Sequence, residues 1–204
     1  MDEIKSRIIT EADTLFLKFG VKSITMDEIA KNVGMSKKTI YQHVNDKDEL
    51  VKLIMQAQMD HQELQVQLIH ATSKDPVDEV LRLSDYLGTV FANMNPFVLM
   101  EIQRYHPKAF DIYLSYKETC LLTCMYENLK WGIEMGLYRP EINIDILSRL
   151  RMQEVEWGFN PQIFKESVKL HEIQIQLIEH FLYGICTLKG HKLINKYKQV
   201  LEEE

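Results

Sequence analysis

The chain has 204 residues, with 24 lysines and arginines against 30 aspartates and glutamates, which gives a net charge of −6 at pH 7. Its N-terminus is charged, and no apolar run approaches the roughly 20 residues of a membrane-spanning helix, so we expect a cytoplasmic protein without membrane contact. Three cysteines are too few for a disulfide framework, and few glycines and prolines are typical of a mostly helical protein.

The chain begins with a pattern typical of an amphipathic helix. Apolar residues recur every three or four positions from Ile4 to Phe19, and Gly20 follows as a residue suited to end a helix. Thr25 and Glu28 then have the spacing of a capping box, in which the hydroxyl and the carboxylate each accept a backbone N–H. A second helix is therefore predicted to begin directly after Thr25.

Two more helix starts follow closely. After a break at Gly34, Ser36 can cap a short helix over residues 37–43, and Asp46 can cap a long helix that reaches about His70. Two short helices that are joined by a glycine-containing turn need scaffold helices on both sides. This arrangement predicts a helix-turn-helix, whose second helix can read DNA.

The charge distribution agrees with a DNA-reading element in spite of the acidic total. Residues 1–52 contain nine lysines and arginines and nine acids, so the acidic surplus lies beyond them, and residues 29–45 contain no acid. Salt screens charges over about 8 Å at physiological ionic strength. A local basic face can therefore bind phosphate while distant acidic residues interfere little.

The rest of the chain also shows helical patterns. Asp75 and Pro76 form a cap followed by an N1 proline, and Pro107 is a second such proline. We find no alternation typical of strands and no internal repeat, so the predicted fold class is all-α. The helices expected after residue 70 are 76–91, 97–105, 107–136, 144–159, 170–188 (ended by Gly190) and 191–201.

Residues 4–54 resemble the DNA-binding domain of the TetR/AcrR family of transcriptional repressors. The resemblance rests on a first helix that ends in FLKFG, on the stretch TMDEIAKNVGMSKKTIYQHV, and on NDKDEL leading into a long helix. Val44 stands where many relatives have phenylalanine, but it keeps the position apolar. The resemblance implies a three-helix helix-turn-helix domain over residues 1–46 and a larger helical effector-binding and dimerisation domain over residues 47–204.

The resemblance also implies DNA contacts that side-chain chemistry supports. Lysines early in the second helix can donate to guanine, glutamine can read adenine, and side chains at helix starts can meet phosphates. In the alternative interpretation, the lysines form a solvated helix face and Tyr41 packs in the core. The candidate DNA-binding residues are Thr25, Ser36, Lys37, Lys38, Thr39, Tyr41, Gln42, His43 and Lys47.

A family member of this kind binds a small molecule in its larger domain, and binding releases the dimer from its operator. Residues 86–131 are dense in aromatic side chains and methionines, which can line a pocket for a small hydrophobic effector or simply form the core. The candidate effector-binding residues are Tyr86, Phe97, Met100, Tyr113, Tyr116 and Trp131.

A homodimer is expected, because one short recognition helix reads few bases and two half-sites about 34–36 Å apart supply the remaining specificity. The apolar stripe over residues 170–188 can pair with another helix, either across a dimer or within its own subunit. The candidate interface residues, on this stripe and on the helix before it, are Leu147, Leu150, Leu170, Ile173, Leu177 and Phe181.

Neither an enzyme, a metal site nor a cofactor is predicted. The sequence shows no nucleophile–base pair, metal-ligand set or glycine-rich phosphate loop, and Cys120 and Cys124 are interpreted as buried thiols. The sequence therefore predicts a ligand-responsive, homodimeric repressor. The alternative is a DNA-associated regulator of the same fold that has no small-molecule effector and is controlled by a protein partner.

Overall fold

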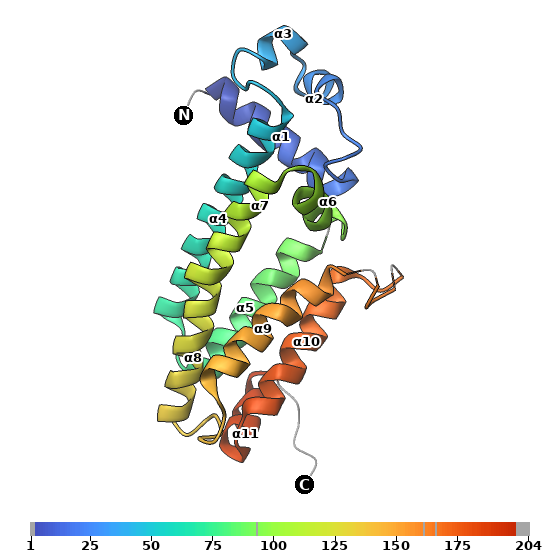
Figure 1. Cartoon of the computed structure of the whole chain (residues 1–204). Coiled ribbons are helices and arrows are strands. Elements are labelled where there is room, and N and C mark those ends of the chain that lie inside the picture. The colour runs from blue at the N-terminus through green and yellow to red at the C-terminus, as the bar shows by residue number, and fades with distance from the viewer. Residues whose placement is uncertain (1–2, 93, 161, 166, 199–204) are drawn as a thin grey trace. The chain divides into compact units, whose positions relative to one another are not determined.

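The protein is built from helices (Figure 1). The computed structural model describes residues 3–92, 94–160, 162–165 and 167–198, and within them it contains no strand, only an isolated bridge between Tyr138 and Cys186. None of the described helices is long and apolar enough to cross a membrane. The all-α prediction is confirmed. The elements are α1 (Glu3–Phe19), α2 (Met26–Val33), α3 (Lys37–Ile40), α4 (Lys47–Thr72), α5 (Pro76–Phe91), α6 (Val98–Tyr105), α7 (Pro107–Tyr116), the π-helical turn η1 (Lys117–Leu121), α8 (Leu122–Glu134), α9 (Ile144–Gly158), α10 (Leu170–Ile185) and α11 (Leu188–Tyr197).

Capping hydrogen bonds start the helices at the predicted positions. Thr25 and Glu28 form the capping box, in which the Thr25 hydroxyl accepts the Glu28 N–H at 3.2 Å and the Glu28 carboxylate accepts the Thr25 N–H at 2.7 Å. Ser36 and Asp46 each accept the N–H three residues further on, at 3.1 and 2.8 Å. Asp75 accepts two amides of the first turn of α5, which begins with Pro76. These local signals therefore set where α2 to α5 begin.

Two predicted helices are divided in the structure. The helix predicted over residues 107–136 is interrupted by η1. The helix predicted over residues 170–188 ends at Ile185, because Cys186 is extended and Thr187 caps α11. Gly190 lies within α11 and does not end a helix. Residues 199–201 of the expected closing helix lie outside the described residues.

Packing divides the chain into two compact units, which differ from the predicted domains. The first unit comprises residues 1–62 and 93–116, and the second comprises residues 63–92 and 117–204. Helix α4 is continuous and belongs to both units. Helices α6 and α7 pack with the N-terminal helices although they lie far from them in sequence, so residue 46 does not mark a boundary in packing.

In the first unit, an apolar core holds the short helices in place. Helix α1 contributes side chains that are entirely or nearly entirely buried, and each of α2, α3 and the start of α4 adds at least one more. The principal buried residues are Ile8, Ala12, Phe16, Val21, Ile29, Val33, Ile40, Val44 and Leu50.

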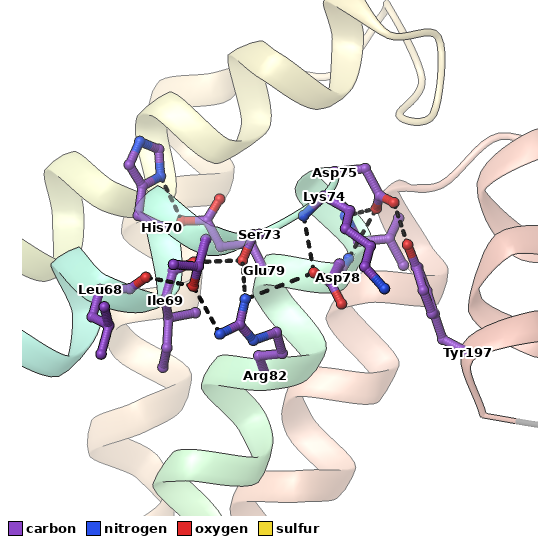
Figure 2. Close-up of polar contacts among 12 residues, drawn as sticks. Leu68, Ile69, His70, Ser73, Lys74, Asp75, Asp78, Glu79, Arg82 and Tyr197 are labelled. Carbon is purple, nitrogen blue, oxygen red and sulfur yellow. Dashed lines mark hydrogen bonds and ion pairs between the residues drawn. The ribbon is translucent and has the colours of Figure 1, made fainter.

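The second unit has a core of its own and a polar network at the junction of α4 and α5 (Figure 2). The core includes Val77, Leu129, Tyr138 and Leu182, all of which are almost completely buried. At the junction, His70 of α4 points to the buried Glu79 of α5, with Nδ1 and Oε1 2.9 Å apart. Arg82 donates to the hydroxyls of Thr72 and Ser73, and the Tyr197 hydroxyl of α11 donates to Asp75. The end of α4 is thereby fixed to α5, and the start of α5 to α11.

Candidate nucleic-acid interface

A tight turn joins α2 to α3. Gly34 has φ +74°, in the left-handed region that side chains disfavour, and nothing lies within 4 Å of the place that its Cβ would occupy. The N–H of Gly34 donates to Lys31 O at 3.2 Å, and the N–H of Met35 donates to Ala30 O at 2.9 Å. The glycine is therefore needed for the backbone conformation rather than for space, and it reverses the chain so that α3 can pack beside α2.

Helix α3 is shorter than predicted. It ends at Ile40, and the amides of Gln42 and His43 donate to carbonyls three residues back, so a tighter turn replaces the last helical residues. Ile40 is completely buried and anchors α3 to the core. Tyr41 is 43% exposed, so the interpretation in which its ring packs in the core is not supported.

The first turn of α3 presents polar side chains to solvent. Lys37 and Lys38 are exposed, as is Ser36, whose hydroxyl lies 2.8 Å from that of Thr39. Lys37 donates to Asp27 of α2 at 3.0 Å, and this hydrogen bond and charge raise the pKa of Lys37. No ion pair of Lys38 occurs within the described residues, so Lys38 is the cation of this turn that is most available to an anion.

The remaining candidates, other than Lys47, lie at the start of α2 and directly after the end of α3. Thr25 is exposed at the start of α2, where its hydroxyl and its N–H both bond to Glu28 and lower the pKa of that carboxyl. Gln42 is exposed and His43 is half-buried. Eight of the nine candidates therefore lie at the start of α2, at the start of α3 or directly after α3, within the first unit.

Lys47 is placed differently. Its ammonium group turns into the domain and donates to Val21 O at 2.6 Å and to Ile24 O at 2.5 Å. The ring of Phe16 lies beneath it, with its centroid 5.6 Å from Nζ. Burial lowers the pKa of Lys47, although nearby carboxylates act in the opposite direction. In this structure, Lys47 is bonded to the turn between α1 and α2.

Arg7 is a supporting residue that the sequence interpretation missed. Its guanidinium donates to Val33 O at 2.8 Å, and Val33 is the last residue of α2. A cation at a helix C-terminus satisfies a free carbonyl and interacts favourably with the helix dipole. Arg7 therefore braces α2 next to the Gly34 turn. Arg7 is the only arginine in residues 1–52 and directly precedes the buried Ile8, and this position was the signal that could have revealed its role.

Comparison with known proteins identifies this domain. Residues 8–54 match the family model of bacterial regulatory proteins, tetR family. The N-terminal domain of this chain belongs to the TetR family. This match and the geometry above confirm the helix-turn-helix prediction.

Curated relatives of the TetR-family domain are regulators. The chain is 35% identical over 60 residues to the HTH-type transcriptional activator FasR of Mycolicibacterium smegmatis, which is 29% of this chain and 27% of FasR. It is 38% identical over 58 residues to the HTH-type transcriptional regulator SAUSA300_2515 of Staphylococcus aureus, which is 28% of this chain and 31% of that protein. The matched segment thus spans less than a third of either relative.

Solved structures extend the similarity of fold to nearly the whole chain. A putative transcriptional regulator from Saccharomonospora viridis, in complex with choline, has a TM-score of 0.73 at 17% identity, covering 92% of this chain and 100% of that one. E. coli NemR in its reduced form has a TM-score of 0.72 at 12% identity, covering 91% and 98%. The ketosteroid transcriptional regulator KstR2 of Mycobacterium tuberculosis has a TM-score of 0.63 at 17% identity, covering 92% and 97%.

The candidate effector-binding residues are divided between the two units. Phe97, Met100, Tyr113 and Tyr116 belong to the first unit, in which the two tyrosines are buried and Met100 is exposed. Tyr86 and Trp131 belong to the second. Burial raises the pKa of Tyr86, and Trp131 makes an edge contact with His70. An effector pocket lined by these residues stays a prediction.

The candidate interface residues lie on α9 and α10. Leu170, Ile173 and Phe181 are buried within the chain itself, and Leu147 and Leu177 are half-buried. Leu150 is 37% exposed and is the most accessible of the six. The six residues therefore differ in how far each is available to a second copy of the chain.

The cysteines are free thiols, and within the described part of the chain no group of three or more histidine, cysteine or acidic residues could hold a metal ion. The Cys124 thiol donates to Glu79 Oε1 at 3.4 Å. Burial, followed by the Glu79 carboxylate, raises the pKa of Cys124 far above its usual value. Cys124 is therefore protonated at neutral pH. Cys120 and Cys124 were predicted to be buried, but both are half-buried, and Cys186 is the buried cysteine.

Proposed function

We propose that the protein is a TetR-family transcriptional regulator that binds operator DNA as a homodimer and is a repressor released by a small hydrophobic effector. The observation that carries the proposal is the first turn of α3. Ser36, Lys37 and Lys38 are exposed there and Thr39 is half-buried, and the buried Ile40 fixes their helix to the core. In helix-turn-helix proteins, this turn of the second helix enters the major groove, where its side chains contact base edges and its lysines also meet the flanking phosphates.

The effector part of the proposal is supported by similarity alone. One protein of similar fold was solved with choline, and others are named as ketosteroid and fatty acid degradation regulators. Steroids and fatty acids have large apolar parts, and choline is a small quaternary ammonium cation of the kind that aromatic faces bind, so the aromatic residues from Tyr86 to Trp131 are suited to ligands of either type. In the DNA-binding part of the proposal, the residues proposed to contact the operator are Thr25, Ser36, Lys37, Lys38, Thr39, Tyr41, Gln42 and His43.

The proposal is tested first by selecting fragments of the organism's own genomic DNA with the purified protein. Fluorescence anisotropy on the selected duplex then measures affinity across a range of salt concentrations. We expect Lys38→Ala to weaken operator binding severalfold and to lower the salt slope by about 0.9 for each phosphate contact that is lost. Lys130→Ala, on an exposed position of α8, is the matched control and should bind as the wild type does.

Choline, a saturated long-chain fatty acid and a steroid ketone are the first effector probes. A probe that releases the operator from the wild-type protein, and that raises the thermal unfolding temperature without DNA, supports ligand-responsive repression. If no duplex is enriched in the selection, or if Lys38→Ala binds the selected duplex as the wild type does, the proposed DNA interface is wrong.

A further inference from the structure

The turn between α1 and α2, residues 20–24, determines the orientation of the two short helices α2 and α3 relative to α1. It begins at Gly20, which has φ +83°, and leads directly into Thr25 at the start of α2. A turn of this kind has backbone N–H and C=O groups that no helix satisfies. In this structure, side chains from two other helices, α4 and α6, bond to them.

Helix α4 contributes Lys47. An ammonium group has three N–H donors, and Lys47 directs two of them to the carbonyls of Val21 and Ile24, at 2.6 and 2.5 Å. Both acceptors belong to the turn and are about one turn's length apart in sequence. Because a single charged group spans both carbonyls, the turn cannot open without breaking charge-assisted hydrogen bonds.

Helix α6 contributes Glu101. Its Oε2 accepts the N–H of Lys22 at 2.9 Å, and it would lie only 2.8 Å from a Cβ atom added at Gly20. Gly20 is thus required for the positive φ and also for the close approach of this carboxylate. The negative charge of Glu101 raises the pKa of Lys47, as the charges of Glu28 and Asp48 do, against the effect of burial.

Both ends of α6 are tied to the same region. Before the helix, the N–H of Asn95 donates to Leu17 O near the end of α1, at 2.7 Å. After it, the imidazole of His106 bonds to Asp48 in the first turn of α4. Glu101 is therefore held over the turn by a helix that is itself fixed on both sides.

We propose that Lys47 and Glu101 are positioning residues for DNA binding, and that Lys47 does not contact phosphate. The positive charge of Lys47 binds carbonyls of the α1–α2 turn, and the negative charge of Glu101 binds an amide of the same turn. The proposal rests on the proposed function, since it concerns how the DNA-reading helices are oriented. It makes operator affinity depend on α6, a helix that lies outside the helix-turn-helix and is distant from it in sequence.

The salt dependence of operator binding distinguishes a lysine that contacts phosphate from a lysine that only positions the turn. Lys47→Met keeps the length of the side chain and removes the charge, and Lys38→Met is the matched control on an exposed lysine. We expect Lys47→Met to lower operator affinity about tenfold with an unchanged salt slope, whereas Lys38→Met lowers the slope by about 0.9 per protomer. An equal drop in slope for both variants would overturn the proposal.

Glu101 is tested by the same assay. Glu101→Gln keeps an oxygen that accepts the Lys22 N–H, and Glu101→Ala removes it. We expect Glu101→Ala to weaken binding severalfold at an unchanged slope, and Glu101→Gln to retain most of the wild-type affinity. If Glu101→Ala binds as tightly as the wild type, α6 does not position the turn.

A spectroscopic measurement makes the test independent of DNA binding and of the folding of the Lys47 variant. In protein labelled at the lysine side chains, NMR follows the titration of the Lys47 signal. We expect Glu101→Gln to lower the pKa of Lys47, and the Lys47 signal to stay in place when operator duplex is added while the Lys38 signal moves. A Lys47 pKa unaffected by Glu101→Gln would overturn the pairing. If no duplex binds at all, the proposed function fails, but the titration still decides whether Lys47 and Glu101 interact.

Discussion

Asp13 links the stability of the first unit to pH. It lies on α1, and its Oδ1 accepts Nε2 of Gln58 on α4 at 2.5 Å. Burial raises the pKa of Asp13 from 3.8 to about 6, with the hydrogen bond from Gln58 acting in the opposite direction. Because the folded state favours the protonated form, the contribution of Asp13 to stability is complete below pH 4 and is lost as the pH rises through 6.

Asp13→Asn should therefore stabilise the protein at neutral pH and not in acid. The amide keeps an oxygen for Gln58 and carries no charge, so it removes the cost of burying a carboxylate. We expect the free energy of unfolding at pH 7.5 to rise by about 1 kcal/mol, which corresponds to a melting temperature higher by about 2–4 °C. Thermal unfolding at pH 7.5 and at pH 4.5 measures this difference. A gain of the same size at both values would show that the charge of Asp13 is not the cause.

Single residues were predictable from the sequence where their partners are close in the chain. Thr25, Ser36 and Asp75 bond to amides two or three residues away, so the cap pattern alone identifies them. Lys47 was not predictable in this way. Its acceptors lie 26 and 23 residues back, and only the folded domain brings them to its ammonium group.

At the scale of elements, apolar periodicity located the helices but not all of their ends. The stripe of α10 continues in sequence to Leu188, yet the helix ends at Ile185. The reason is tertiary, because the N–H of Arg139 donates to Ile185 O and the N–H of Thr187 donates to Leu137 O, each at 2.9 Å. Pairing with a distant segment thus draws Cys186 out of the helix, and no local pattern carries that information.

The packing of Tyr138 against Gly132 of α8 can be tested by replacing this glycine and, as a control, a glycine that has no close neighbour. A Cβ at Gly132 would lie 1.9 Å from the ring of Tyr138, which is completely buried and whose hydroxyl lies 3.0 Å from both Pro76 O and Asn128 Oδ1, within hydrogen-bond distance of each. The ring cannot move without breaking these bonds. We expect Gly132→Ala to lower the free energy of unfolding by about 3 kcal/mol.

Gly184→Ala is the control for that substitution. Gly184 lies on α10, and nothing is found within 4 Å of its Cβ position, so alanine adds helix propensity without a clash. We expect a gain of about 0.5–1 kcal/mol in the free energy of unfolding. Chemical denaturation of both variants measures the contrast, and a similar loss in both would contradict the packing described for Tyr138.

At the scale of the whole molecule, the sequence predicted two domains, but packing groups the helices differently. A boundary at residue 46 follows from the motif, which is a local feature. The inclusion of α6 and α7 in the first unit depends on contacts such as Glu101 with Lys22, which are 79 residues apart. The chain therefore passes between the units three times, within α4 at residues 62–63, between α5 and α6 at residues 92–93, and from α7 into η1 at residues 116–117.

The exposed face of α9 is where we expect a second copy of the chain to bind. Ile146, Leu150 and Trp157 are all exposed, and their spacing of four and seven residues places them on one side of the helix. A monomer rarely exposes such an apolar stripe without a partner. Leu177 on α10 is half-buried, so a charge there would disturb the subunit itself, and Leu150 gives the cleaner test.

Leu150→Glu should convert the proposed dimer into a monomer that keeps its helical content. The buried charge disfavours association because its desolvation is not compensated. Sedimentation velocity measures the change of mass, and circular dichroism confirms that the helices remain. Leu188→Glu, at a position of α11 that is 81% exposed, is the control and should leave the oligomeric state unchanged.

The monomer should also bind the operator more weakly, since each recognition helix reads one half-site. A dimer that survives Leu150→Glu would place the interface on another face of the molecule.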